Sequence, residues 1–193
     1  MPVERGPGEV SGVNATQRSI LNAYAELVEE LGTDDVSFRL IAVRAGMGER
    51  TVFRNYPTRV DLLLATATWI ERTVFVRQQP QSIFDVPLAI RESMDIYDRR
   101  PELTHLVAEV SMRGVAGAEP APNRALFDEM LLLEVPSLSA AERRAIVAAL
   151  SHLDSPATWV TLRRELGFSG RDITDAASWA AESVLDPIRD EVG

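Results

Sequence analysis

The fold of this chain is decided by residues 36–64, which read VSFRLIAVRAGMGERTVFRNYPTRVDLLL. The segment predicts two short helices around a glycine turn, followed directly by the start of a third helix. The first helix carries Phe38, Ile41 and Ala45 at the i, i+3, i+7 spacing of a buried stripe. Gly46 supplies the positive φ that a tight turn between two crossing helices requires. This pattern is typical of a helix-turn-helix.

The second helix, expected over residues 49–56, combines a small apolar side with a polar outer face. We expect Val52 and Phe53 to be buried. The residues expected to face outward are Glu49, Arg50, Thr51, Arg54 and Asn55. A short polar helix that carries arginines suits the major groove of DNA.

The third helix begins at a plausible capping box, because Thr58 is followed three residues later by Asp61. Arg59 then lies in a first turn whose free N–H groups and dipole favour a phosphate. Residues 36–60 contain five arginines and one glutamate, a local charge of +4. Because the whole chain carries −9, the remainder carries −13. A basic patch on an acidic protein predicts a local phosphate-binding surface.

The stretch IAVRAGMGERTVFRNYPTRVDLL resembles the DNA-binding signature of the TetR family of bacterial one-component repressors. An Ile-Ala pair, an Ala-Gly turn, an aromatic-rich recognition helix and a basic residue before Leu-Leu recur there in this order. The resemblance covers about residues 16–64. It implies a homodimeric repressor that binds a palindromic double-stranded DNA operator and is released by a small-molecule effector. The residues placed at the DNA are Ser37, Arg39, Gly48, Glu49, Arg50, Thr51, Arg54, Asn55, Tyr56, Thr58 and Arg59.

Four positions depart from the family pattern. Gly48 replaces a hydroxyl residue that caps the recognition helix, Phe53 replaces a tyrosine, and Arg59 replaces a lysine. Arg50 stands where glycine is common and adds a potential base or phosphate contact. Tyr56 has two interpretations, a hydroxyl donor to phosphate or a buried hinge residue. These departures bear on the operator sequence and not on the mode of binding.

Composition excludes several classes of chemistry. The 193 residues include no cysteine and only two histidines, and all twenty basic residues are arginine. Disulfides, thiol catalysis and lysine Schiff bases are therefore impossible. The sequence offers no metal-ligand spacing, phosphate loop or nucleophile–base set, so we expect no metal, no cofactor and no enzyme activity. Neither a membrane span nor a signal peptide is visible, which predicts a cytoplasmic protein.

The pattern of residues along the whole sequence predicts an all-α protein with three parts. We expect a disordered arm over residues 1–14, a helix-turn-helix DNA-binding domain over 15–60, and a helical effector-binding and dimerisation domain over 61–193. In the last part, the third helix should run to about residue 78, some 30 Å, before Pro80 ends it. Ser139, Ser155 and Ser169 are candidate caps, and residues 114–122 form a loop. Further helices are expected near residues 84–98, 101–113, 123–134, 140–153, 156–166 and 171–189.

The middle helices carry the candidate ligand site. Its residues are Trp69, Met94, Tyr97, His105, Met112, Phe127 and Met130. They either line a mostly apolar pocket, with Tyr97 and His105 as its polar groups, or form ordinary core packing. The family resemblance implies a pocket among them. The methionines and aromatic rings point to an apolar or aromatic effector.

The last two helices carry the candidate dimer interface. Its residues are Trp159, Leu162, Leu166, Ala176, Trp179, Ala180 and Val184. Small residues let helices approach closely, and each helix adds a tryptophan with a large area to bury. In the TetR family the two C-terminal helices of each subunit form a four-helix interface. The alternative is that both tryptophans belong to the core of one subunit.

Two other functions compete with a regulator. The chain is alternatively an all-α protein that binds or sequesters a small molecule without operator function, or an interaction module whose arginines meet an acidic protein. Specific DNA binding would fall steeply with salt and show a sequence preference, whereas a carrier would show none.

Overall fold

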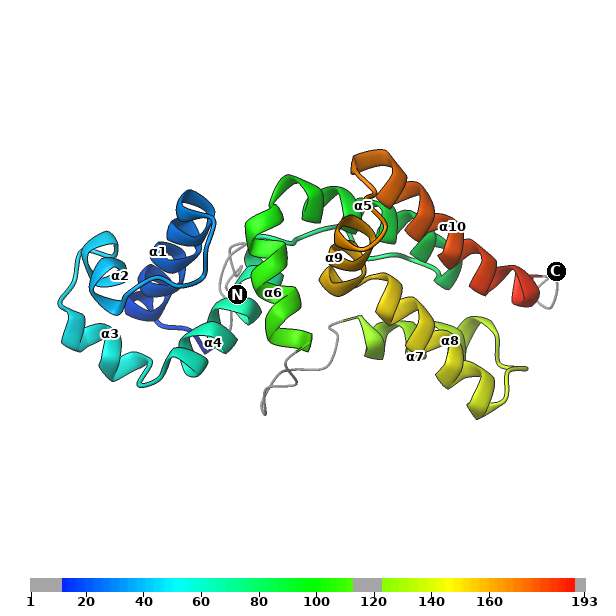
Figure 1. Ribbon diagram of the computed structural model, residues 1–193. Coiled ribbons are helices and arrows are strands. Elements are labelled where there is room, and N and C mark those ends of the chain that lie inside the picture. The colour runs from blue at the N-terminus through cyan, green and yellow to red at the C-terminus, as the bar shows by residue number, and fades with distance from the viewer. Residues whose placement is uncertain (1–11, 113–122, 190–193) are drawn as a thin grey trace. The chain divides into compact units, whose positions relative to one another are not determined.

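Helices make up the regular structure of the chain (Figure 1). The computed structural model describes residues 12–112 and 123–189, and within these ranges it contains no β-strand. The chain divides into two compact units, one ending at Val76 and the other starting at Arg77. The division therefore lies about one helix later than the expected boundary at residue 60, because the third expected helix packs against the helix that precedes the helix-turn-helix, residues 15–31.

The first unit holds α1 (Ala15–Leu31), α2 (Phe38–Arg44), α3 (Glu49–Asn55) and α4 (Arg59–Thr73). α1 packs against both α2 and α4, and α2 packs against α3. The core of the unit is formed by side chains that are fully buried, among them Ile20, Tyr24, Ile41, Val52 and Ile70. Ile41 and Val52 are buried as predicted, whereas Phe38 and Ala45 of the predicted stripe are only partly buried.

Local signals set the ends of these helices. Gly32 ends α1 in the left-handed region with a φ of +64°. The Ser37 hydroxyl accepts a hydrogen bond from the Leu40 amide at 3.2 Å and so caps α2. At α4, Thr58 and Asp61 form the reciprocal capping box that the sequence predicts. The predicted capping box of α4 is confirmed.

α4 is shorter than expected. It spans 15 residues, about 22 Å at the usual rise, and ends at Thr73 rather than near residue 78. The residues at its end, Thr73-Val74-Phe75-Val76, are mostly β-branched, and such side chains lose χ1 freedom in a helix. The Val74 amide still bonds to the Ile70 carbonyl at 2.8 Å. Pro80 lies well beyond this end, so the predicted stop signal was wrong.

The second unit holds a short 3-10 helix and six α-helices among its described residues. They are η1 (Ile83–Asp85), α5 (Val86–Arg99), α6 (Pro101–Met112), α7 (Arg124–Glu134), α8 (Ala140–Leu153), α9 (Pro156–Arg164) and α10 (Gly170–Arg189). These bounds confirm the six expected helices to within about two residues. The expected loop over residues 114–122 and most of the expected arm lie outside the described residues.

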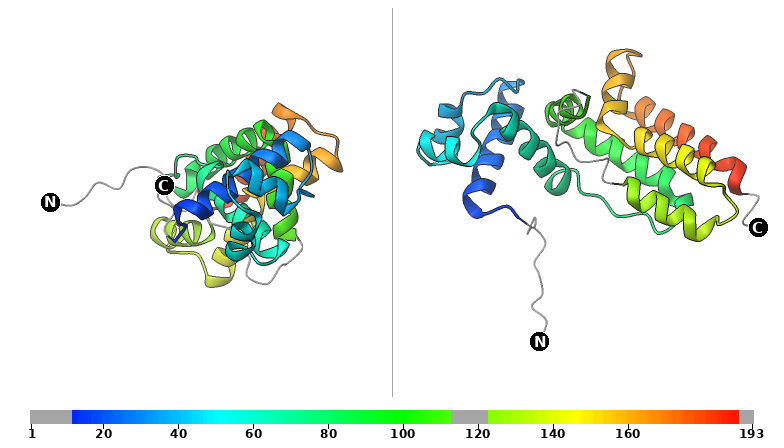
Figure 2. Two further views of the ribbon diagram at one scale, coloured as in Figure 1. Left: turned by 90° about the vertical axis from the view of Figure 1, so that its left-hand side faces the viewer. Right: turned by 90° about the horizontal axis from the view of Figure 1, so that it is seen from below.

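α10 and α5 form the longest packed pair of the second unit and run side by side (Figure 2). α10 buries Ile173, Ala177, Ala181 and Leu185, which recur every four residues on one face. The two alanines on this face allow a close approach of the helix axes. α6 packs on α9, and α7 packs on α8. The buried face of α10 is thus used within the subunit, which leaves its opposite face for another role.

The predicted caps of the second unit have mixed outcomes. Ser139 forms a capping box with Glu142, and Ser155 caps α9 through the Thr158 amide. Hydrogen bonds from Ser139 lower the pKa of Glu142. Ser169 is not a side-chain cap, because the Asp172 amide bonds to its backbone carbonyl at 2.8 Å.

Candidate DNA-binding site

The helix-turn-helix is closed by backbone hydrogen bonds at the turn. The Gly46 amide bonds to the Val43 carbonyl at 3.2 Å, and the Met47 amide bonds to the Ala42 carbonyl at 3.0 Å. Gly46 has a φ of +68°, as the sequence predicts. Ala42 is buried beneath the crossing helix, where a larger side chain would separate α2 from α3. The turn therefore fixes the direction of α3 against α2.

α3 presents a polar surface over a single buried valine. Val52 is fully buried, whereas Glu49, Arg50 and Arg54 are exposed. Thr51 and Asn55 are partly buried, and the Asn55 amide group donates to the Thr51 carbonyl at 2.8 Å. The outward placement of Glu49, Arg50 and Arg54 is as predicted.

Three exposed arginines of this unit have no side-chain partner among the described residues. Arg39, Arg50 and Arg54 are exposed and make no hydrogen bond or ion pair there; we call them the free arginines. Arg50 and Arg54 are four positions apart and share one side of α3. Their guanidinium groups keep all five donors for an external acceptor.

Arg44, a fourth arginine of the predicted basic patch, is neutralised inside the unit. Its guanidinium bonds to Glu30 at 2.8 Å and approaches Glu26 at 3.4 Å. This contact lowers the pKa of Glu30 and raises that of Arg44. The acidic end of α1 therefore neutralises Arg44. Fewer arginines are therefore available to an external anion than the five that residues 36–60 contain.

Arg59 also points into the protein. Its Nη1 donates to the Val36 carbonyl at 2.7 Å, and its Nη2 lies 3.5 Å from the Tyr24 hydroxyl. The Tyr24 hydroxyl in turn donates to the Asp34 carbonyl at 2.8 Å. Arg59 thus ties the start of α4 to the segment that joins α1 and α2. This placement differs from the expected phosphate contact, because the buried Val36 carbonyl needs a donor.

The first turn of α4 is also less open than expected. The Asp61 amide bonds to the Thr58 hydroxyl at 3.1 Å, and the Asp61 carboxylate accepts from the Thr58 amide at 3.0 Å. The capping box therefore uses part of the donor set that was assigned to phosphate. It also places a carboxylate at the positive end of the helix dipole.

The aromatic residue of α3 is more exposed than predicted, and the tyrosine at its C-cap is buried. Phe53 was expected to be buried, but 45% of its surface is exposed. Tyr56 is only 6% exposed, which favours its interpretation as a buried hinge residue, and burial raises its pKa to about 12. Val52 and Tyr56 are four positions apart and together fill the inner face of this seven-residue helix. Phe53 follows Val52 directly in the helix, so its side chain projects away from that face.

A helix-turn-helix with a short, arginine-bearing second helix, supported by two further helices, defines a DNA-binding domain. Residues 20–66 match the family model of the bacterial regulatory proteins of the tetR family. The first unit is therefore similar to the helix-turn-helix domain of that family, and the chain is a DNA-binding transcriptional regulator. No curated protein and no solved structure matches the chain significantly.

The residues expected to bind an effector are separated by the structure. Met94, Tyr97, Phe127 and Met130 are buried in the second unit, on α5 and α7. Burial also lowers the pKa of His105, whose ring meets the Trp159 ring edge-on at 5.4 Å. These five residues stay compatible with a pocket lining or with core packing.

Two members of the expected ligand site lie elsewhere. The Trp69 indole donates to the Asn22 side chain at 2.8 Å, so Trp69 belongs to the core of the first unit. The packing of α4 against α1 is the reason, because Trp69 lies on the side of α4 that meets α1. Met112, at the end of α6, is 58% exposed. Both placements are corrections to the predicted set.

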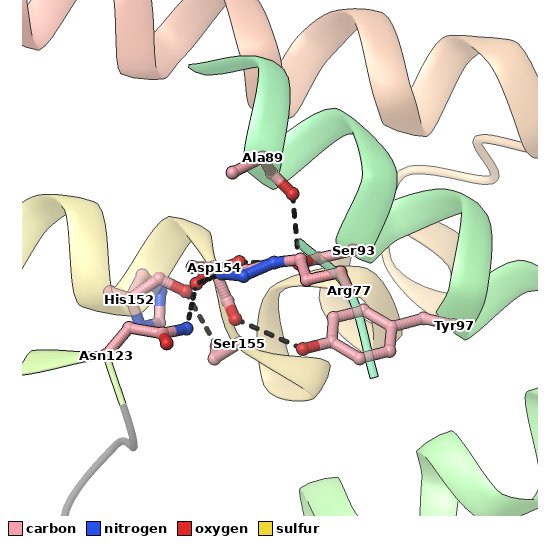
Figure 3. Close-up of polar contacts among 8 residues, drawn as sticks. All are labelled: Arg77, Ala89, Ser93, Tyr97, Asn123, His152, Asp154 and Ser155. Atoms are coloured by element: carbon pink, nitrogen blue, oxygen red, sulfur yellow. Dashed lines mark hydrogen bonds and ion pairs between the residues drawn. The ribbon is translucent and has the colours of Figure 1, made fainter. Parts of the chain in front are cut away.

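A buried polar cluster in the second unit was missed by the sequence reasoning (Figure 3). Asp154, between α8 and α9, accepts hydrogen bonds from Arg77, Asn123 and the Ser93 hydroxyl, the last at 2.7 Å. Arg77 Nε also donates to the Ser93 hydroxyl at 2.7 Å. The Tyr97 hydroxyl donates to the Asp154 carbonyl at 3.2 Å. We call these five residues the Asp154 cluster.

The Asp154 cluster is almost inaccessible to solvent. The side chains of Arg77 and Asp154 are 6% and 1% exposed. Burial raises the pKa of Asp154, while Arg77 and the hydrogen bonds from Ser93 and Asn123 oppose the rise. The sequence signal was weak, since Asp154 looks like an ordinary carboxylate at a helix end. Only tertiary structure brings residues 77, 93, 123 and 154 together.

The expected dimer residues also divide into two groups. Trp159 is fully buried, and its indole lies 3.3 Å from an Asp98 carboxylate oxygen in the same subunit. Trp159 is therefore a core residue, which corrects its assignment to the interface. Leu166 and Trp179 are exposed, the latter by 69%. The remaining members, all partly buried, are Leu162, Ala176, Ala180 and Val184.

Neither a metal site nor a membrane span is found in the described residues. No group of three or more histidine, aspartate or glutamate side chains there has a geometry that would hold a metal ion. Among the same residues, no helix combines the length and apolar character that crossing a membrane requires.

Proposed function

We propose that the chain is a homodimeric, ligand-responsive repressor that binds a palindromic operator and leaves it when a small-molecule effector binds. The observation that carries the proposal is the set of free arginines on the helix-turn-helix of a chain whose net charge is −9. In so acidic a protein, three exposed arginines without acidic partners are suited to an external anion. Duplex DNA supplies that anion in the geometry that a helix-turn-helix fits.

In this proposal Arg50 and Arg54 act from one side of α3. Their spacing lets one guanidinium approach a base edge while the other contacts the backbone. Arg39, on α2, contacts the flanking phosphates. Arg59 acts indirectly, because its bond to the Val36 carbonyl holds the start of α4 and so supports the helix-turn-helix.

Dimerisation follows from the need for specificity. One helix-turn-helix covers too few base pairs to select an operator, and a two-fold dimer would read two half-sites. The outer face of α10 supports this arrangement, because Trp179 is flanked by Ala176 and Ala180 on the side away from α5. An exposed tryptophan beside small residues is a favourable anchor for a second copy of the same helix.

The proposed effector binds inside the second unit, near Met94, Phe127 and Met130. Their side chains favour an apolar or aromatic molecule. The Asp154 cluster gives this unit a link to the connecting segment, because Arg77 opens the second unit and is held by Asp154. An effector that displaced α5 would move Ser93 and with it the anchor of Arg77. The two recognition helices would then lose the separation that matches the half-sites.

The deciding experiment is footprinting on the DNA upstream of the chain's own gene at several salt concentrations. We expect one protected palindrome and an affinity that falls steeply with salt. Uniform weak binding without a protected site would refute operator recognition and favour a small-molecule carrier. Protection that persists with every ligand that binds the second unit would leave a DNA-binding protein but refute the proposed release.

A further inference from the structure

An exposed aromatic pair lies on the helix-turn-helix and is not explained by its core. The rings of Phe38 on α2 and Phe53 on α3 are stacked, with centroids 4.4 Å apart and planes 18° apart. Phe38 is partly buried, whereas 45% of Phe53 is exposed. Burial would remove this apolar surface from water at a gain of about 25 cal/mol per Å². In the protein alone, the exposed part of Phe53 stays in contact with water, so this favourable free energy is not gained.

The stack holds the Phe53 ring in place. A phenylalanine side chain has two rotatable bonds, and contact with Phe38 on the neighbouring helix limits both of them. The ring is therefore presented as a rigid apolar surface rather than as a mobile side chain. Phenylalanine has no hydrogen-bonding atom, so any partner of this surface must be apolar at the point of contact.

The surroundings of the ring identify the occupant. Phe53 is next to Arg54 and three positions after Arg50, and Phe38 is next to Arg39. All three arginines are exposed and without a partner among the described residues. Surfaces that combine cations with an apolar centre match an anionic partner that carries an isolated apolar group. In the major groove of DNA that group is the C5 methyl of thymine.

We propose that Phe53, held by Phe38, contacts the C5 methyl of a thymine in each half-site and so selects a T·A pair there. The inference rests on the operator recognition proposed above and adds one base to it. Arg50 and Arg54 bring the helix to the groove, and the Phe53 ring then distinguishes thymine from cytosine, which presents a hydrogen atom at the same position. Removing the methyl group alone should weaken binding by roughly fourfold per half-site, and by about fifteenfold when both are changed.

The test uses an operator obtained by selecting randomised duplexes on the full-length protein. Each thymine is then replaced by deoxyuridine, one symmetric pair at a time, which removes the methyl group and leaves the pairing unchanged. We expect one symmetric pair at which the wild-type affinity falls about fifteenfold. The variant Phe53→Ala should bind the parent operator more weakly and lose the preference for thymine over deoxyuridine at that pair only. The variant Val60→Ala, which truncates another exposed apolar residue of the same unit, should keep it.

The outcomes separate the inference from the proposed function. If selection enriches no sequence, operator recognition itself fails and the thymine contact fails with it. If an operator is found but deoxyuridine has no effect at any position, only the thymine contact is overturned. The same conclusion follows if Phe53→Ala keeps the full preference for thymine. The deoxyuridine series on the wild-type protein requires no folded variant, so a destabilised Phe53→Ala protein cannot obscure the result.

Discussion

The arginines of the first unit differ in their availability to an external acceptor, because some of them are already bound by groups of the protein. Arg44 is bound by Glu30, and Arg59 is bound by the Val36 carbonyl, so neither is available without breaking an internal contact. Arg50 and Arg54 break nothing when they meet an acceptor. In the proposed complex, we therefore expect Arg50 and Arg54 to supply most of the binding energy, because Arg44 and Arg59 must exchange one hydrogen bond for another.

Replacing either free arginine of α3 should weaken operator binding without unfolding the protein. For Arg50→Ala or Arg54→Ala, loss of a base contact would reduce the binding free energy by about 1–3 kcal/mol and relax specificity. Loss of a phosphate contact would instead reduce the salt dependence of the affinity. Gel-shift titrations at several salt concentrations distinguish the two. Arg144→Ala, at an exposed position of α8, is the control. Unchanged affinity in both α3 variants would remove these residues from the interface.

Tyr56 should ionise only in strongly alkaline solution. Burial raises its pKa from 10.0 to about 12. Between these pH values the unfolded chain loses the phenol proton while the folded chain keeps it, so stability falls as the pH rises. No lysine titrates in this range to mask the effect. Tyrosinate absorbance should show a late step near pH 12 that is absent from Tyr56→Phe. If the step that Tyr56→Phe removes instead lies near pH 10, the Tyr56 phenol is accessible and its predicted phosphate contact is reinstated.

Helix starts and turns could be predicted from the sequence where a few consecutive residues determine them. The capping box at Thr58, the turn at Gly46 and the cap at Ser139 each depend on a few consecutive residues, and all were predicted. The exposure of Phe53 and the inward turn of Arg59 depend on how helices cross, which residue spacing does not encode. The candidate site was therefore predictable as a segment but not contact by contact.

The two glycines around the turn of the helix-turn-helix should respond oppositely to serine. Gly48 has an ordinary φ of −76°, leaves open space for a Cβ atom and provides no side-chain cap for α3. Gly48→Ser should stabilise the helix by roughly a few tenths of a kcal/mol. Gly46 has a φ of +68°, so Gly46→Ser should destabilise the turn by about 1 kcal/mol. Hydrogen exchange of the α2 and α3 amides measures both effects, and equal protection in the two variants would contradict the assignment.

Removing one partner of the buried Arg77–Asp154 ion pair should destabilise the protein strongly. Replacing both partners with apolar side chains should destabilise it much less. Asp154→Ala leaves the Arg77 guanidinium buried and unpaired, which should cost about 3–5 kcal/mol of stability. The double variant Arg77→Met with Asp154→Leu replaces the pair with apolar side chains and should recover most of that loss. Urea unfolding followed by circular dichroism measures both. A mild effect of Asp154→Ala would indicate that water enters the cluster and solvates Arg77.

At the scale of the whole molecule, the arrangement of charge and apolar surface is consistent with two separate tasks. The free arginines lie on the first unit, whereas the most exposed tryptophan, Trp179, lies on α10 of the second. The chain reserves the inner face of α10 for α5 and presents the outer face with Trp179 at its centre. An exposed tryptophan beside small residues is a favourable anchor for a partner chain. In our proposal that partner is a second copy.

The variant Trp179→Arg should therefore convert the dimer to a monomer. An arginine at the two-fold axis would face its own copy, and this like-charge contact adds to the lost burial. Sedimentation equilibrium should give a dimer for the wild type and a monomer for the variant, with unchanged helicity. The matched control is Leu133→Arg, at an exposed leucine of α7. Operator affinity should fall steeply in Trp179→Arg, since a monomer contacts only one half-site. A wild type that remains monomeric at high concentration would refute the interface, and a dimeric Trp179→Arg would place it on another surface.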